Sequence, residues 1–205
     1  KAIVDIGDRD EGRRVAAGPG GTVLVGGRTG TDGFALRLTA SGARDLTYGV
    51  GGVAVAATGY TDDLSGQLDM DMHATASGVV TLAYSDLNLT RVVRLQPNGA
   101  ADMGFDGDGT LSFDLLPGPE SDQQVVRSGD RTYVAVGRSG AYWVRALALD
   151  GAADPGFNGG GFLFVDPGEG EVTATDAIVD GSGALVITGV ETSGQDSRWS
   201  VVRVR

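Results

Sequence analysis

A short glycine-rich loop, Phe105–Gly109, carries two alternating carboxylates, Asp106 and Asp108. Closely spaced carboxylate oxygens are the hard ligands that calcium prefers. The loop holds only an Asp-x-Asp-Gly motif, whereas an EF-hand loop needs further acidic positions and a terminal Glu. Aspartates are also common in glycine turns that bind no ion. Asp106 and Asp108 are therefore candidate calcium ligands with a purely structural alternative, and the sequence suggests no other cofactor.

A second acidic stretch contains Asp62 and Asp63, followed by Asp69 and Asp71. If residues 69–71 form a strand, the side chains of Asp69 and Asp71 lie on the same face, where they would suit a metal or a ligand. Charges that keep an edge strand from pairing with another sheet explain them equally well. We take Asp62 and Asp63, which lie in an insertion, as tentative binding residues.

His73 is the only histidine in the chain, which has no cysteine. A catalytic histidine needs an orienting partner, and Asp71 is the nearby group that would supply it. One histidine and no cysteine leave too few ligands for a zinc site. A hydrolase or lyase that uses His73 is therefore a secondary alternative, and we expect the chain not to be an enzyme.

Trp143 and Trp199 stand at similar places before a recurring arginine-bearing segment, where Phe34 stands in the first copy. An aromatic residue at this place packs between neighbouring sheets or, in a sugar-binding protein, stacks its ring on a pyranose. Trp143 and Trp199 are therefore tentative binding residues, for a protein or for a carbohydrate.

All these residues belong to a chain that repeats itself. Segments 34–45, 91–102 and 143–154 are nearly the same, and each precedes an aromatic residue and a glycine cluster. The separation is 57 residues from Gly42 to Gly99 and 52 residues from Gly99 to Gly151. A repeat of this length, rich in short strands, is typical of propellers and arrays. The recurring positions are Gly42, Gly99 and Gly151; Asp45, Asp102 and Asp154; and Tyr48, Phe105 and Phe157.

Short runs rich in β-branched residues follow glycine turns at 22–26, 79–84, 132–137 and 184–189. Together with the less regular segment before each turn, they predict hairpins. The next strand carries Arg37, Arg94 and Arg203, with Ala146 in the third copy. We expect these arginines to pair with neighbouring carboxylates and the repeated aspartates to accept backbone N–H groups in turns.

The sequence predicts an all-β fold in one domain, residues 1–205, made of four repeats at approximately 1–48, 49–105, 106–157 and 158–205. Each repeat is expected to form a blade of about four antiparallel strands in a small β-propeller. A fourth strand for the last blade is missing after Arg205. The segment Ala2–Ile6 has the pattern to supply it, which closes the ring and removes exposed edges. The alternative is an open arc of a larger or multimeric propeller.

The repeated stretch consists of Leu36-Arg37-Leu38 with Gly42, Asp45, Tyr48 and Gly52, and its copies lie around Gly99 and Gly151. This stretch resembles the delta-60 repeat family of bacterial proteins. The likeness covers nearly the whole chain, although Ala146 and the Tyr48-Gly-Val-Gly segment depart from the pattern. The resemblance implies a β-propeller-like array in a large bacterial protein that is extracellular, periplasmic or on the cell surface. It implies no enzymatic activity, because the repeat has no shared catalytic set.

Charge and composition exclude several kinds of partner. The formal net charge of −11 opposes binding to nucleic acid and to anionic membrane surfaces. No apolar run approaches the ~20 residues needed for membrane insertion. The absence of cysteine excludes disulfides and thiolate catalysis. The chain starts at Lys1 with no evident signal peptide, which we interpret as a processed or excised segment.

We therefore expect a non-enzymatic secreted or surface-associated module for binding or scaffolding. Its partner would be another protein or a surface polysaccharide, recognised by loops on a rigid scaffold. A carbohydrate-binding, lectin-like propeller is the alternative, and it predicts that Trp143 or Trp199 is exposed. The oligomeric state is left open by the sequence.

Overall fold

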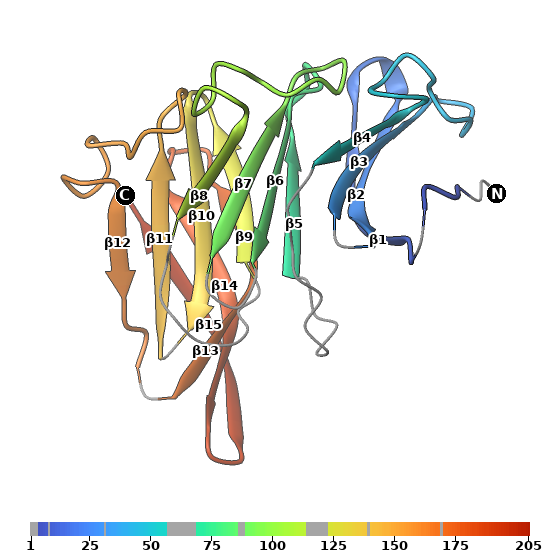
Figure 1. Cartoon of the computed structure of the whole chain (residues 1–205). Coiled ribbons are helices and arrows are strands. Elements are labelled where there is room, and N and C mark those ends of the chain that lie inside the picture. Colours follow the sequence, from blue (N-terminus) through green and yellow to red (C-terminus); the bar gives the residue numbers. More distant parts are fainter. Residues whose placement is uncertain are drawn as a thin grey trace.

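The computed structural model describes residues 4–7, 9–30, 32–56, 69–85, 89–113, 123–138, 140–168 and 170–205. Within these residues the chain is all-β, with four antiparallel sheets and no α-helix, as the sequence predicts. The sheets follow one another along the chain, and within each sheet the strands lie in chain order (Figure 1). No helix in this part of the chain is long and apolar enough to cross a membrane.

The strands have the following bounds. Sheet 1 contains β1 (Glu11–Ala17), β2 (Val23–Thr29), β3 (Asp32–Leu38) and β4 (Val53–Ala56). Sheet 2 contains β5 (Asp69–Ala74), β6 (Val80–Ser85), β7 (Thr90–Leu95) and β8 (Thr110–Phe113). Sheet 3 contains β9 (Gln123–Ser128), β10 (Arg131–Arg138), β11 (Ala141–Leu147) and β12 (Phe162–Val165). Sheet 4 contains β13 (Glu171–Val179), β14 (Leu185–Ser193) and β15 (Asp196–Val204).

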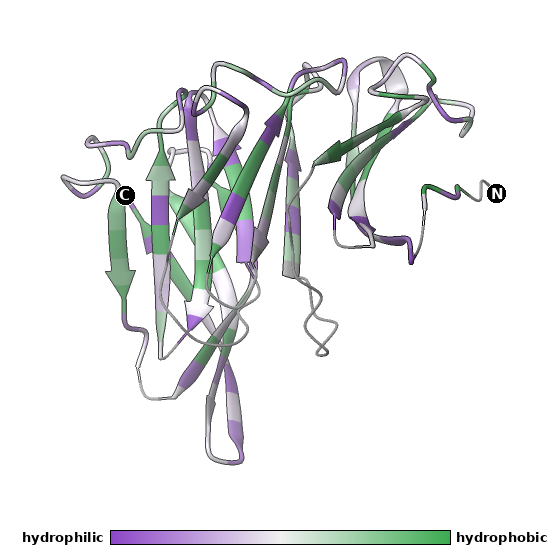
Figure 2. Ribbon diagram, viewed as in Figure 1, coloured by the Kyte–Doolittle hydropathy of each residue, from purple (hydrophilic) through white to green (hydrophobic). Residues whose placement is uncertain are grey.

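Each sheet has two faces, because successive residues of a strand point to opposite sides. We call the side toward the following sheet the forward face and the opposite side the rear face. In sheet 1, Ala35 lies on the forward face and Leu36 on the rear face. Hydrophobic residues follow the strands, whereas hydrophilic residues gather in loops and at the tip of the β14–β15 hairpin (Figure 2).

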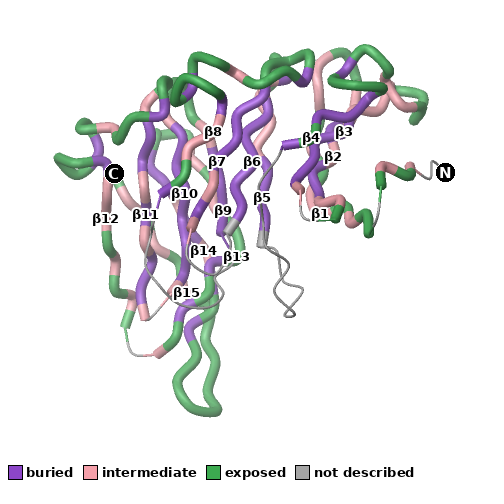
Figure 3. Tube along the Cα trace, in the orientation of Figure 1, coloured by how far each residue is buried: buried purple, intermediate pink, exposed green. Residues whose placement is uncertain are grey.

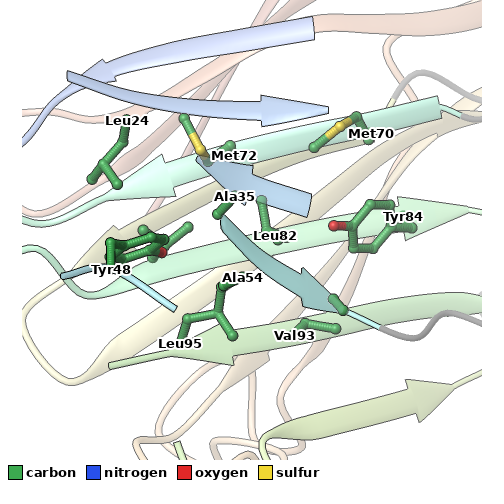
Figure 4. Close-up of a cluster of buried hydrophobic side chains, with 12 residues drawn as sticks. Leu24, Ala35, Tyr48, Ala54, Met70, Met72, Leu82, Tyr84, Val93 and Leu95 are labelled. Atoms are coloured by element: carbon green, nitrogen blue, oxygen red, sulfur yellow. The ribbon is translucent and has the colours of Figure 1, made fainter. Parts of the chain in front are cut away.

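The core lies between consecutive sheets. Between sheets 1 and 2, Leu24 and Ala35 meet Met72, Leu82 and Val93 (Figure 4). Comparable clusters join sheet 2 to sheet 3 and sheet 3 to sheet 4. The first strands form the centre of these interfaces, since β1 contacts β5, β5 contacts β9, and β9 contacts β13. Complete burial of a Leu or Val side chain stabilises a fold by roughly 1.5–3 kcal/mol, so these interfaces hold the array together.

The loop between the third and fourth strands repeats the same hydrogen bonds in sheets 1 to 3. In sheet 2, the N–H of Asp102 donates to the carbonyl of Arg94 (2.9 Å), and the N–H of Phe105 donates to the carbonyl of Asp102 (2.8 Å). Neighbouring loops are also joined, because the N–H of Gly49 donates to the carbonyl of Asn98 (2.7 Å). The loops therefore keep the sheets in a fixed order and spacing.

The expected closure of the ring by the N-terminal strand is wrong for the residues that the structure describes. There β15 pairs with β14 alone, and residues 4–6 form no strand. Val4 and Ile6 instead pack with Phe34, Leu36 and Val53 on the rear face of sheet 1. Within the described part of the chain no sheet lies on this apolar face, and the apolar segment 4–6 covers it instead. The four sheets form an open arc, with sheet 1 at one end and sheet 4 behind sheet 3 (Figure 1).

Candidate functional site

Two of the repeated arginines pair with repeated aspartates, and Arg203 pairs with Asp180. In sheet 2, Arg94 Nε donates to the Asp102 carboxylate at 2.7 Å, and the guanidinium lies 4.6 Å from the centroid of the Phe105 ring. Arg37 and Asp45 form the same 2.7 Å pair in sheet 1. The expected pairing of these arginines with neighbouring carboxylates is confirmed.

The third repeat keeps this arrangement by a different route. Ala146 stands where the arginine is expected, and its cross-strand neighbour Tyr133 fills part of the space. Arg131, at the start of β10, supplies the guanidinium: its Nε donates to Asp154, and it lies 5.9 Å from the centroid of the Phe157 ring. The sequence pattern shows only a missing arginine, because the replacement comes from another strand.

Hydrogen bonds keep Asp45 and Asp154 ionised. The hydroxyl and N–H groups of Thr47 lower the pKa of Asp45, and its arginine partner adds to this effect. Arg131 lowers the pKa of Asp154, helped by the N–H of Gly156. These carboxylates are therefore suited to holding turns in place over a wide pH range.

Asp71 joins the first strands of three sheets. Its Oδ1 accepts a hydrogen bond from Arg14 Nε in β1 (2.7 Å), and its Oδ2 accepts one from the N–H of Val125 in β9 (2.7 Å). The residue is only 8% exposed, so its carboxylate depends on these partners. The side chain of Asp69 lies outside the described part of the chain, so the expected Asp69–Asp71 pair stays a prediction.

His73 lies two residues along β5 from Asp71. Its ring is partly buried, and this burial together with the charge of Arg127 lowers its pKa. The imidazole is therefore neutral at physiological pH. Because the neighbouring carboxylate of Asp71 already holds Arg14 and a backbone N–H, it is poorly placed to orient a catalytic base.

Asp106 and Asp108 lie on an exposed turn. The N–H of Asp106 donates to the carbonyl of Asp150 in the loop of sheet 3 (2.7 Å), and Asp108 Oδ1 accepts the N–H two residues further on (2.8 Å). Among the described residues, no three His, Asp or Glu side chains gather closely enough to hold a metal. Calcium at this turn stays a prediction, and Asp62 and Asp63 lie outside the described residues.

Trp143 belongs to a cluster of aromatic residues near the edge of sheet 3. Its ring centroid lies 4.7 Å from that of Phe164 and 5.4 Å from that of Phe162, and its Nε1 donates to the carbonyl of Arg138 (3.3 Å). The indole is partly buried, while Phe164 is 49% exposed. Packing within the sheet therefore accounts for most of the Trp143 surface.

Trp199 is 80% exposed and does not correspond to Trp143. It lies four residues before Arg203, as Tyr142 lies four residues before Ala146. The two tryptophans were expected at equivalent strand positions, but these positions differ by one residue. Because successive residues of a strand point to opposite sides, their side chains lie on opposite faces of their sheets. Sequence reasoning missed this because the two tryptophans have similar neighbours.

The forward face of sheet 4 carries exposed apolar residues among polar ones. Its large apolar residues are Ile178 (55% exposed), Val190 (37%), Trp199 (80%) and Val201 (53%). In sheet 3, the residues that correspond to Trp199 and Val201 are Tyr142 and Val144, and both are completely buried under sheet 4. Figure 3 shows that β14 and β15 are exposed toward the tip of their hairpin. This forward face, left uncovered by the described residues, is the candidate functional site.

Comparisons with known proteins do not assign this site. No family model and no curated protein matches the chain. The chain is similar to a solved GH43 glycoside hydrolase, engineered in its active site to display endo-xylanase and exo-arabinofuranosidase activity, with 12% identity and a TM-score of 0.45. The similarity covers 90% of this chain and 35% of the hydrolase chain. A likeness this distant carries no functional conclusion.

Proposed function

We propose that this chain is a propeller-like, non-enzymatic binding module of a secreted or cell-surface protein, and that it binds a protein partner through the forward face of sheet 4. The observation that carries the proposal is the exposure of Trp199 beside Val190 and Val201 on this face. Large exposed apolar patches mark interaction sites, and tryptophan is among the residues that contribute most to binding energy.

A binding role also fits the polar groups better than a catalytic role. The carboxylate of Asp71 is occupied by Arg14 and Val125, and the repeated aspartates hold turns. An acid or base catalyst needs a group that can exchange a proton with a substrate. Asp71 is therefore used to connect sheets, and the repeated aspartates are used to hold turns.

Carbohydrate binding is the second candidate function, because Trp199 meets its requirement for an exposed tryptophan. The hydroxyls of Thr192 and Ser197 lie near the indole on the neighbouring strand positions, 3.4 Å from each other. An exposed ring flanked by hydroxyl groups suits a stacked sugar. A rise in the thermal midpoint with one sugar, lost in Trp199→Ala, would favour this function over protein binding.

Site-specific photo-crosslinking tests the proposed function. A photoreactive phenylalanine derivative replaces Trp199 in one variant and Met103, which is 61% exposed on a loop of sheet 2, in the control. In extracts of cells that produce the chain, we expect a discrete crosslink to a protein from position 199 and none from position 103. Equal labelling from both positions, or none from either, would show that sheet 4 has no partner.

A further inference from the structure

We infer that a small oxyanion of the phosphate or sulfate type binds between sheets 2 and 3, where Thr81, Arg94 and Arg127 hold it. This site is separate from the forward face of sheet 4, so it goes beyond the proposed function. Two observations point to it: a polar layer whose counterparts at the other interfaces are mostly apolar, and two buried polar groups in that layer without a hydrogen-bond partner among the described residues.

The forward face of sheet 2 carries a row of three polar side chains. Strand register pairs His73 of β5 with Thr81 of β6, and Thr81 with Arg94 of β7. Ala83 and Val92, each two residues from a member of this row, pack in the cluster between sheets 2 and 3. Because residues two apart on a strand share a face, the row points toward sheet 3.

Arg127 of β9 faces this row from sheet 3. Asp71 accepts the N–H of Val125, which fixes β9 against β5. Arg127 and His73 each lie two residues further along these strands and therefore come to the same level. Burial lowers the pKa of His73, and the nearby charge of Arg127 lowers it further.

The other two interfaces are mainly apolar at this level. In place of Thr81, sheet 1 has Leu24 and sheet 3 has Tyr133, and both are buried in apolar clusters. At the position of Arg127, sheets 2 and 4 have small or apolar residues, Ala74 and Val179. Packing of apolar side chains therefore accounts for those interfaces, whereas the interface between sheets 2 and 3 buries polar groups.

Two polar groups of the row are buried and have no hydrogen-bond partner in the described part of the chain. They are Oγ1 of Thr81, a residue that is 1% exposed, and Nη1 of Arg94, a residue that is 2% exposed. Buried polar groups are rarely left without a partner. Because a guanidinium group only donates hydrogen bonds, the partner of Arg94 Nη1 must be an acceptor.

The equivalent Arg37 of sheet 1 shows which contacts Arg94 lacks. Nη1 of Arg37 donates to the carbonyl of Pro97 (2.6 Å), and its Nη2 donates to the hydroxyl of Thr47 (3.0 Å). In the loop of sheet 2, Gly104 stands at the position of Thr47, so it offers no hydroxyl. Both arginines keep an aspartate partner at Nε and an aromatic ring beside the guanidinium, so the difference lies at the outer nitrogens.

The charges favour an anion as the acceptor. Burial and the nearby charge of Arg94 lower the pKa of Arg127, although Asp130 and Asp102 act in the opposite direction. An anion between the two guanidinium groups offsets their repulsion, and the guanidinium fork matches the geometry of oxyanions. The hydroxyl of Thr81 adds a further donor. Arg127 is only partly buried, which leaves the ion a way in beside it.

Isothermal titration calorimetry with sodium sulfate tests the site, with sodium chloride at the same ionic strength as the control titrant. We expect one sulfate to bind per wild-type chain. Thr81→Val keeps the shape of the side chain but removes a hydrogen bond to a charged group, so it should weaken sulfate binding about tenfold or more. Thr90→Val is the matched control, since Thr90 is 4% exposed at the other end of β7, and it should bind sulfate as the wild type does.

Arg127→Gln is the second variant, and it keeps the test decisive if circular dichroism shows that Thr81→Val does not fold. Its position is partly buried, and the loss of the guanidinium should again weaken sulfate binding about tenfold or more. Sulfate also stabilises folded proteins in general because it is excluded from their surface. A rise in the thermal midpoint therefore supports the site only if it is larger in the wild type and Thr90→Val than in Thr81→Val and Arg127→Gln.

Saturable sulfate binding that Thr90→Val keeps and the two site variants lose would support the oxyanion site. No saturable binding to the wild type, or full binding by both site variants, would overturn it, and a buried water would then be the acceptor for Arg94. Neither result bears on the proposed protein partner, because crosslinking from position 199 tests the face of sheet 4 separately.

Discussion

Asp71 accepts the backbone N–H of Val125 at 2.7 Å, although 54 residues separate them in the chain. The same carboxylate holds Arg14 of sheet 1, so one side chain connects three consecutive sheets. This relationship explains how an open array keeps its geometry at the inner strands, where the sheets come closest. It also defines the position that Asp176 occupies in sheet 4.

Removing this carboxylate should destabilise the whole array. Asp71→Ala leaves the N–H of Val125 without its acceptor and Arg14 without its counter-charge, which costs roughly 2–4 kcal/mol of unfolding free energy. Urea unfolding measures the loss. Asp130→Asn, at an exposed turn position, serves as the control and should change little. A stability loss no larger than that of the control would show that Asp71 does not connect the sheets.

Two glycines of the repeat test whether neighbouring loops pack on one another. Gly42 and Gly99 both have φ near +83° to +84°, but a Cβ at Gly42 meets nothing within 4 Å, whereas one at Gly99 lies 2.7 Å from the N atom of Gly49. Gly42→Ala should cost about 1 kcal/mol for its backbone conformation alone. Gly99→Ala should cost a further 1–3 kcal/mol or so, because it forces the loops apart. Equal costs in thermal unfolding would argue against the contact.

Arg131 and Asp154 should behave as a coupled pair in spite of the altered third repeat. We expect a double-mutant cycle with Arg131→Ala and Asp154→Asn to give a coupling energy of roughly 0.5–1 kcal/mol, because both side chains are partly exposed. Additive effects of the two substitutions would mean that Arg131 has not replaced the arginine missing at position 146.

Acid should weaken the fold through the same carboxylates. The pKa values of Asp45 and Asp154 are lowered from 3.8 in the folded chain, so each group stabilises the fold at pH above 3.8. This contribution is lost as the pH falls through the lowered folded values. The free energy of unfolding, measured with urea between about pH 6 and pH 2, should show this decline. In Asp154→Asn this free energy should fall less steeply as the pH is lowered. An unchanged slope in that variant would exclude Asp154 as a contributor.

The repeat predicted much of the architecture. The register of Gly99, Asp102 and Phe105 identified the loops, and the glycine turns identified the hairpins, because these features depend on local backbone chemistry. The all-β class followed from the same short, β-branched runs.

Features that depend on contacts between distant strands were not predictable in this way. The N-terminal segment has the pattern of a strand, yet its apolar side chains pack on Phe34 and Val53 of sheet 1 instead of pairing with β15. Arg131 replaces a missing arginine from another strand, and Asp71 contacts residues more than fifty positions away on both sides. The exposed face around Trp199 depends on which sheet lies beside it, which a repeat pattern alone does not specify.

The described residues of the chain leave Trp199 on the forward face of sheet 4 uncovered, and its fluorescence tests this directly. Trp143→Phe leaves Trp199 as the only tryptophan. In this variant we predict a red-shifted tryptophan emission that acrylamide quenches nearly as strongly as that of free tryptophan, since Trp199 is 80% exposed. A blue-shifted emission protected from acrylamide in the monomer would contradict the claim, because it would mean that another part of the same chain covers this face.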